Sequence, residues 1–125
     1  MAVQYQVDPA NRVVRTTFSG IVEHQDPSAY ALKLRNDPAF DSGFSELISF
    51  EAWSEIRLSF WDFRDDLDPF SKTSKCAIVA GADQTIYGIA RMCQTVRDDR
   101  NVRIFTTRDE AEAWLRKKPP GSSGQ

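Results

Sequence analysis

Hydrophobic residues recur along this chain with two different spacings, which predict strands and helices in alternation. Alternating apolar and polar residues, or a run rich in apolar residues, indicate β-strands in five segments: 3–7, 12–19, 45–50, 76–80 and 102–105. Apolar residues spaced three or four positions apart indicate amphipathic helices that begin near residues 26, 59, 83 and 107. The order is therefore β-β-α-β-α-β-α-β-α, and helices between successive strands favour parallel pairing with right-handed crossovers.

Turn and cap residues mark the boundaries of these elements. The turn residues at 8–11 predict a hairpin between the first two strands, which makes the sheet mixed. Asp26 is expected to cap the first helix, with Pro27 in its first turn, and residues 51–56 are expected to form a loop. The other helices have N-cap residues at their starts: Ser59, Asp83 and Thr107. The predicted fold class is α/β, with a mixed five-stranded sheet and about four helices.

Length and charge narrow the range of functions. With 125 residues the chain is expected to form one domain over 1–117, followed by a small polar tail, 118–125, expected to be disordered. Sixteen basic and eighteen acidic residues leave a formal net charge of -2, so no field is expected to gather nucleic acid or anionic lipid. No membrane-length apolar run or N-terminal signal pattern occurs, so we expect a soluble, cytoplasmic protein.

Residues that commonly carry catalysis are scarce. The two cysteines, Cys76 and Cys93, have no metal-type spacing and fit small buried positions. The single histidine, His24, stands apart from any nucleophile motif, and no P-loop or H-E-x-x-H sequence occurs. We therefore expect no catalytic residue, no metal and no cofactor.

Aromatic residues around the second predicted helix form the leading candidate site. Phe60 and Phe63 fit the inner face of that helix, whereas Trp61 shares its side with charged residues, and Trp53 lies in the preceding loop. The two tryptophans have three interpretations: they cover the edge of the core, anchor a protein interface, or wall a ligand pocket.

Tyr87 and Arg91 form a second candidate on the third predicted helix. They lie four residues apart on its outer face, where such pairs stabilise a helix modestly. Arginine also holds anionic groups well, so Arg91 is a candidate ligand contact as well as a surface residue.

Several short motifs, taken in order, resemble a known family. They are Thr-Phe-Ser-Gly at 17–20, Asp-Pro-x-Phe at 37–40, Glu-Leu-Ile-Ser-Phe at 46–50, Ala-Ile-Val-Ala at 77–80, Tyr-Gly-Ile-Ala-Arg-Met at 87–92, and Phe105 followed by Glu-Ala-x-x-Trp-Leu at 110–115. This arrangement resembles the SpoIIAA-like family, which groups STAS-like and Sec14-like domains. The resemblance implies a STAS-like fold over nearly the whole domain. It leaves function open, since fold alone does not define function.

The chain departs from the STAS pattern at the regulatory position. STAS antagonists carry a phosphorylated Ser or Thr in an Asp-Ser-Gly-like turn after the third strand, and no such turn occurs here. Ser54 and Ser59 are the only hydroxyl residues in that region, so they are the phosphoacceptor candidates. An N-cap role accounts for Ser59 without phosphorylation.

These observations favour a non-enzymatic regulatory or protein-interaction domain, whose partner is another protein or a second copy of the chain. The alternative is a carrier or sensor of a small apolar or lipid-like ligand, which the aromatic residues and the Sec14-like side of the resemblance support. A phospho-switch at Ser54 or Ser59 is the third reading.

Overall fold

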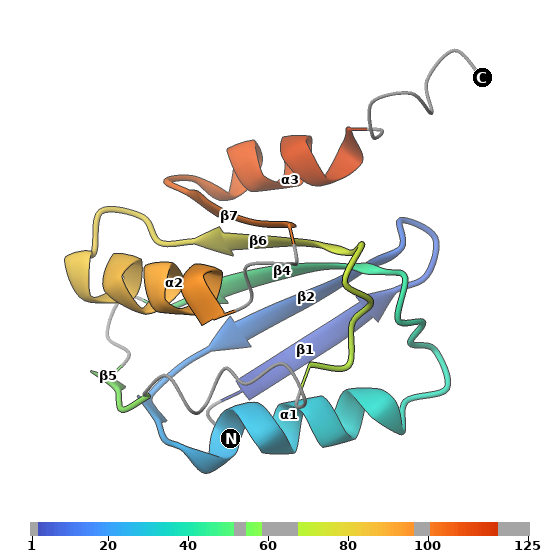
Figure 1. Ribbon diagram of the computed structural model, residues 1–125, viewed down its shortest axis with the longest axis horizontal. Coiled ribbons are helices and arrows are strands. Elements are labelled where there is room, and N and C mark those ends of the chain that lie inside the picture. Colours follow the sequence, from blue (N-terminus) through green and yellow to red (C-terminus); the bar gives the residue numbers. More distant parts are fainter. Residues whose placement is uncertain (1–2, 52–54, 59–67, 97–100, 118–125) are drawn as a thin grey trace.

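A five-stranded mixed sheet forms the centre of the computed structural model, which describes residues 3–51, 55–58, 68–96 and 101–117 (Figure 1). In spatial order the strands are β1 (Val3–Asp8), β2 (Val13–Phe18), β4 (Ser45–Phe50), β6 (Lys75–Val79) and β7 (Asn101–Phe105). β1 and β2 form the predicted antiparallel hairpin, and every other neighbouring pair is parallel. The predicted α/β class and the mixed five-stranded sheet are confirmed.

Helices cover both faces of this sheet. α1 (Gln25–Arg35) and α2 (Gln84–Val96) lie on one face, and α3 (Arg108–Arg116) lies on the other (Figure 1). Because the strand order follows the chain order, right-handed crossovers place their helices on the same face. The described residues contain three helices, one fewer than expected, and the helix predicted to begin at Ser59 lies outside them.

A second, very small sheet was not predicted. β3 (Ile21–Val22) and β5 (Glu55–Ile56) pair in parallel, so the expectation that 51–56 is a loop was wrong at its last two residues. Two backbone hydrogen bonds of 2.8 Å hold the pair together. The amide of Glu55 donates to the carbonyl of Gly20, and the amide of Arg57 donates to the carbonyl of Val22. Strands of two residues are too short to show a periodicity, which is why the sequence pattern missed them.

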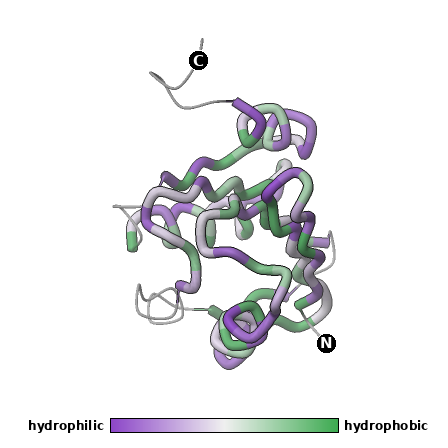
Figure 2. The backbone as a smooth tube through the Cα atoms, turned by 90° about the vertical axis from the view of Figure 1, so that its right-hand side faces the viewer, coloured by the Kyte–Doolittle hydropathy of each residue, from purple (hydrophilic) through white to green (hydrophobic). Residues whose placement is uncertain are grey.

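The strand alternation divides the buried residues between two cores. The larger core fills the space between the sheet, α1 and α2, and the smaller one lies under α3. Figure 2 shows hydrophobic and polar positions interleaved along the backbone, as this division requires. The larger core includes Val14, Phe18, Tyr30, Leu34, Ile48, Cys76, Ile78, Ala90 and Cys93. The smaller one contains Val13, Leu47, Ala77, Ala111 and Trp114. Burial of both cysteines is confirmed.

The helix starts test the predicted caps. Asp83 is confirmed, because its Oδ1 accepts the amides of Thr85 at 2.8 Å and Ile86 at 3.1 Å. Thr107 is also confirmed as the cap of α3, where its Oγ1 accepts the Glu110 amide at 3.2 Å.

The predicted cap of the first helix was wrong. Helix α1 begins at Gln25, ahead of the expected cap, and His24 at the N-cap position makes no side-chain capping bond. Asp26 lies within the first turn, where its carboxylate accepts a hydrogen bond of 2.7 Å from the backbone amide of Glu23. A negative charge at this position still complements the helix dipole. Pro27 is in the first turn, as predicted.

Candidate functional site

An apolar pocket lies between the sheet and the two helices on its larger-core face. We call it the inner pocket, and its volume is about 40 Å³. A single water needs roughly 10–15 Å³ when space is measured in this way, so the inner pocket has room for more than one water molecule. Most of its wall is hydrophobic and comes from β2, β4, β6, α1 and α2: Phe18, Ala31, Ile48, Ile78, Ile89 and Ala90. Leu58, Asp68 and Pro69 also line the pocket.

One carboxyl group stands out in this apolar wall. Glu46 belongs to the central strand β4 and is only 2% exposed. Side chains alternate along a strand, so Glu46 shares its face with Ile48 and Phe50 and points into the larger core. The sequence therefore places an acid where the pattern expects an apolar residue.

Two hydroxyl groups connect to this carboxyl. The Tyr30 hydroxyl donates to Glu46 Oε2 at 2.8 Å, and Thr16 Oγ1 lies 2.7 Å from the same hydroxyl oxygen. A tyrosine hydroxyl has one hydrogen, which here goes to Glu46, so the Thr16 hydroxyl must donate to Tyr30. The hydrogen bonds run from Thr16 to Tyr30 and from Tyr30 to Glu46, whose carboxyl oxygen accepts.

The protonation of Tyr30 keeps this direction fixed. Burial raises the pKa of the Tyr30 hydroxyl well above its usual value of 10.0, and the nearby Glu46 charge raises that pKa further. Both effects disfavour the phenolate, because a negative charge would be buried beside another. Tyr30 therefore remains a neutral donor throughout the physiological pH range.

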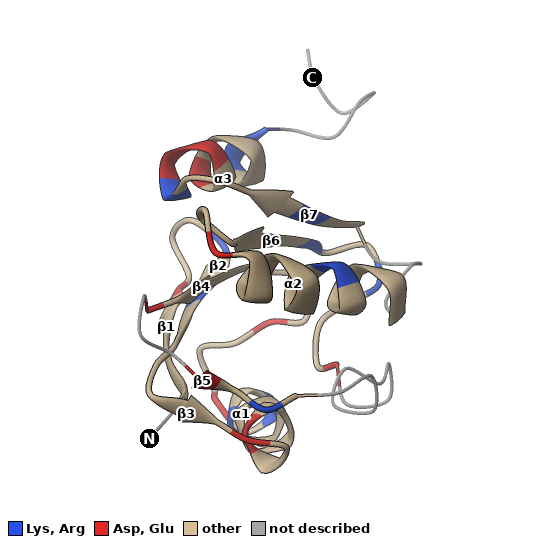
Figure 3. Cartoon of the chain, turned by 90° about the vertical axis from the view of Figure 1, so that its left-hand side faces the viewer, with Lys and Arg blue, Asp and Glu red and all other residues tan. Residues whose placement is uncertain are grey.

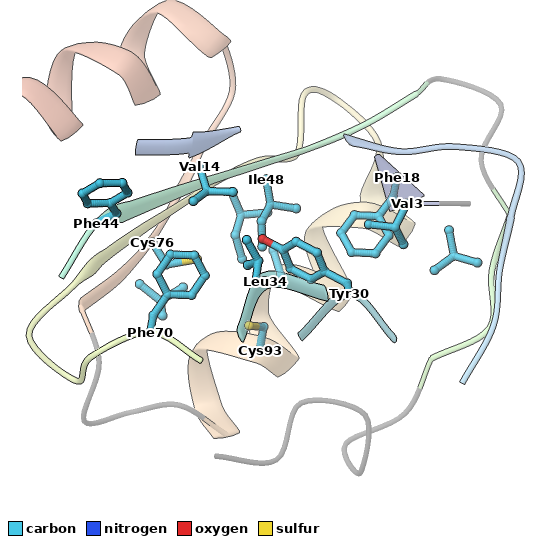
Figure 4. Packing of buried hydrophobic residues seen from close by; sticks show 14 residues of the cluster. Val3, Val14, Phe18, Tyr30, Leu34, Phe44, Ile48, Phe70, Cys76 and Cys93 are labelled. Atoms are coloured by element: carbon cyan, nitrogen blue, oxygen red, sulfur yellow. The ribbon is translucent and has the colours of Figure 1, made fainter. Parts of the chain in front are cut away.

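Three separate elements position the network. Thr16 comes from β2, Tyr30 from α1 and Glu46 from β4, and β2 and β4 pair with Val14 opposite Glu46. The Tyr30 ring packs edge-on against Tyr5 and Phe18, with ring centroids 5.8 and 6.4 Å apart. Figure 4 shows its hydroxyl oxygen directed toward the strands rather than toward solvent. Aromatic packing thus holds the Tyr30 donor in place.

A wider crevice lies at the carboxyl ends of β4 and β6. Its volume is about 320 Å³, and Phe50 lines both this crevice and the inner pocket. Asp83 also lines the crevice, but its carboxylate already accepts hydrogen bonds from the backbone amides at the start of α2. Strands arranged in chain order have no topological switch point, the usual ligand site of open α/β sheets. The inner pocket is therefore the stronger candidate.

Most of the residues predicted from sequence to form a site lie outside the described residues. These are Trp53, Phe60, Trp61 and Phe63, with the phosphoacceptor candidates Ser54 and Ser59. Their roles stay predictions.

Tyr87 and Arg91 lie on the exposed side of α2, as predicted, and neither lines the inner pocket. Tyr87 is 50% exposed, and Arg91 Nη1 donates to Gln94 Oε1 at 2.8 Å. The structure does not bring this pair together with the inner pocket.

Sequence reasoning missed the polar network. The available signal was the position of Glu46, which strand alternation puts on the same face as Ile48. An acid on the core face of a central strand requires a hydrogen-bond partner.

The opposite face of the sheet carries a separate charged cluster. Arg15 bonds Glu112 of α3 through Nε and Nη2 at 2.9 and 3.2 Å, and donates from Nη1 to Asp8 at 2.8 Å. Figure 3 shows both acidic and basic residues on α3. This bidentate contact fixes α3 to the hairpin, so we interpret the cluster as structural.

The described residues contain neither a metal-binding cluster nor a membrane-spanning helix. No group of three or more His, Cys, Asp or Glu side chains there could hold a metal ion. No described helix combines the length and the apolar character that a membrane crossing requires.

Comparison with known proteins adds no assignment. Neither protein-family models, nor curated proteins, nor solved structures match this chain. The geometry of the inner pocket therefore carries the functional argument.

Proposed function

We propose that this chain is a non-enzymatic domain that binds a small apolar ligand, as a carrier or a sensor. The observation that supports this most directly is the buried Thr16–Tyr30–Glu46 network in the wall of the inner pocket. Small-molecule sites typically combine a hydrophobic wall with a few fixed polar groups that orient the ligand. The inner pocket has this composition.

The polar groups are arranged before a ligand binds. Among the described residues, no buried side-chain nitrogen or oxygen lacks a hydrogen-bond partner. A network that is already ordered does not lose side-chain entropy again when a ligand enters, which favours binding. A carboxylate accepts several hydrogen bonds at once, so a ligand donor is able to share Glu46 with Tyr30.

The other expected functions rest on residues outside the described part. The interaction surface was centred on Trp53 and Trp61, and the phospho-switch on Ser54 or Ser59. Membership in the SpoIIAA-like, STAS-like group also remains a proposal, supported by the motif order and by the α/β arrangement. Ligand binding comes first because the apolar wall of the inner pocket and its buried Thr16–Tyr30–Glu46 network support it.

Filling the inner pocket tests this function. Ala31 of α1 lines the pocket and is 5% exposed, whereas Ala29, two residues earlier on the same helix, is exposed. Ala31→Val adds two methyl groups to the pocket wall, and Ala29→Val makes the same change toward solvent. Both substitutions place a β-branched valine in α1, so both carry the same loss of helix propensity. Each protein is purified from its own cells and measured by native mass spectrometry.

The proposed function predicts a small molecule bound to the unaltered protein and to Ala29→Val, and its loss from Ala31→Val. Thermal unfolding of both variants checks that each one is folded. A bare polypeptide mass for the unaltered protein contradicts the proposal, and so does a ligand that folded Ala31→Val retains at full occupancy.

A further inference from the structure

The inner pocket is small for a ligand site. Its volume of about 40 Å³ has room for roughly three or four water-sized groups, whereas ligand pockets in proteins usually measure about 300–1,000 Å³. The crevice at the carboxyl ends of β4 and β6 measures about 320 Å³, which falls within that range. A ligand of typical size therefore extends beyond the inner pocket, and the crevice is large enough to receive the rest.

Three elements lead from the inner pocket into the crevice. Residues two apart on a strand, or three apart on a helix, lie on the same face of their element. β4, β6 and α2 each provide one residue to the pocket and a neighbour on the same face to the crevice. The pairs are Ile48 and Phe50 of β4, Ile78 and Ala80 at the end of β6, and Ile89 and Ile86 of α2. The two hollows therefore follow one another between the sheet and α2.

Phe50 stands where the two hollows meet. Among the described residues, it is the one that lines both. Its ring stacks on Phe18, its partner in the β2–β4 pair, with ring centroids 5.2 Å apart. Beyond Phe50, the crevice continues along the apolar side chains of Val79 and Ile86. An apolar surface of this kind suits a hydrocarbon chain, because each methylene removed from water favours binding.

We propose that the inner pocket and the crevice form one elongated site, joined at Phe50, for a ligand with a linear aliphatic chain. The polar end of the ligand lies against the Thr16–Tyr30–Glu46 network, and the chain passes the Phe50 ring into the crevice. Residues 81–83 line the crevice and are exposed, so the ligand has access from solvent there. The inference rests on the proposed function, because it extends the same pocket and specifies the shape of its ligand.

Two neutral alcohols test the length of the site without altering the protein. The probes are 1-butanol and 1-octanol, which carry the same hydroxyl group and differ only in chain length. Each is titrated at constant pH and salt, and binding is followed by methyl NMR of isoleucine. Ile48, Ile78 and Ile89 report on the inner pocket, and Ile86 reports on the crevice. Ile21 on β3 is 50% exposed and reports non-specific contact.

We expect 1-butanol to shift mainly the pocket isoleucines, and 1-octanol to shift these and Ile86 with one common dissociation constant. Each fully buried methylene strengthens binding by up to about fourfold, so four further methylenes in an open crevice should give at least about tenfold. Equal affinities of the two alcohols, separate dissociation constants for pocket and crevice, or an unmoved Ile86 overturn the inference and leave the inner pocket as a ligand site. If neither alcohol shifts the pocket isoleucines, the proposed function fails, and the inference with it.

A substitution at the crevice rim then locates the chain. Ala82 lines the crevice and is exposed, so Ala82→Gln adds a longer, polar side chain there without entering either core. Ala113→Gln is the control, because Ala113 is an exposed residue of α3 across the sheet. Ala82→Gln should weaken 1-octanol at least about fivefold and leave 1-butanol within about twofold, whereas the control should change neither. Undiminished binding of 1-octanol by folded Ala82→Gln overturns the assignment of the chain to the crevice. If Ala82→Gln does not fold, the comparison of the two alcohols on the unaltered protein still decides the inference.

Discussion

Removing the Tyr30 hydroxyl is the most direct perturbation of the buried network. Tyr30→Phe leaves the ring in its contacts with Tyr5 and Phe18 but takes away a donor from Glu46 and an acceptor from Thr16. A hydrogen bond to a charged group contributes about 1.5–3 kcal/mol to stability, and a neutral one about 1 kcal/mol. Tyr30→Phe should therefore lower the free energy of unfolding by about 2–4 kcal/mol.

Urea unfolding followed by circular dichroism measures this change. With a slope of about 2 kcal/mol per molar urea, the midpoint should fall by roughly 1–2 M while the slope stays constant. The control is Tyr87→Phe, since Tyr87 is half-exposed on α2, and exposed substitutions usually stay within about 0.5 kcal/mol. If Tyr30→Phe changes stability no more than Tyr87→Phe does, the network contributes nothing and the reasoning is refuted.

A double-mutant cycle separates the two bonds of Tyr30. Thr16→Val alone should cost about 1 kcal/mol, because Glu46 keeps its Tyr30 donor. In a protein that already carries Tyr30→Phe, the Thr16 hydroxyl has no bond to residue 30 left to lose. Thr16→Val should therefore lower the free energy of unfolding by less. A coupling energy of at least about 0.5 kcal/mol is expected, and purely additive effects would show that the residues do not act as one network.

Two further predictions concern α3. Hydrogen bonds to Asp8, first from Asn11 and then from Arg15, lower its pKa to about 2, and the bond from Arg15 also lowers the pKa of Glu112. A carboxyl with a lower pKa in the folded state stabilises the protein above its unfolded pKa, about 4, and this contribution is lost as pH falls toward 2. The thermal unfolding temperature should thus fall more steeply between about pH 4 and pH 2 in the unaltered protein than in Arg15→Gln. Parallel curves of unfolding temperature against pH would contradict the assignment. At the start of the same helix, Thr107→Ala should cost about 1 kcal/mol in urea unfolding because the Glu110 amide loses its cap, whereas Thr107→Ser should be nearly neutral. Equal losses in the two variants would show that the cap oxygen is unimportant.

The local pattern of the sequence determined much of the fold. Hairpin turn residues, helix caps such as Asp83 and Thr107, and the apolar spacing of α2 act within a few positions along the chain. Such short-range effects leave a periodic signal that sequence analysis detects. Asp26 shows the limit of this signal, because a carboxylate favourable in the first turn of a helix resembles one that caps it.

Long-range pairing decided the rest. Strand alternation indicates that Glu46 points toward a core, but it does not specify what meets it there. Thr16, Tyr30 and Glu46 are separated by 14 and 16 positions, and only the register of β2 against β4 and the packing of α1 bring them together. The pairing of β3 with β5 likewise depends on where distant segments meet, since two-residue strands have no period of their own. The sequence alone determined the five strands of the main sheet, the three described helices and their inner faces. The tertiary structure decided which side chains share the inner pocket, because contacts between distant segments leave no mark on local spacing.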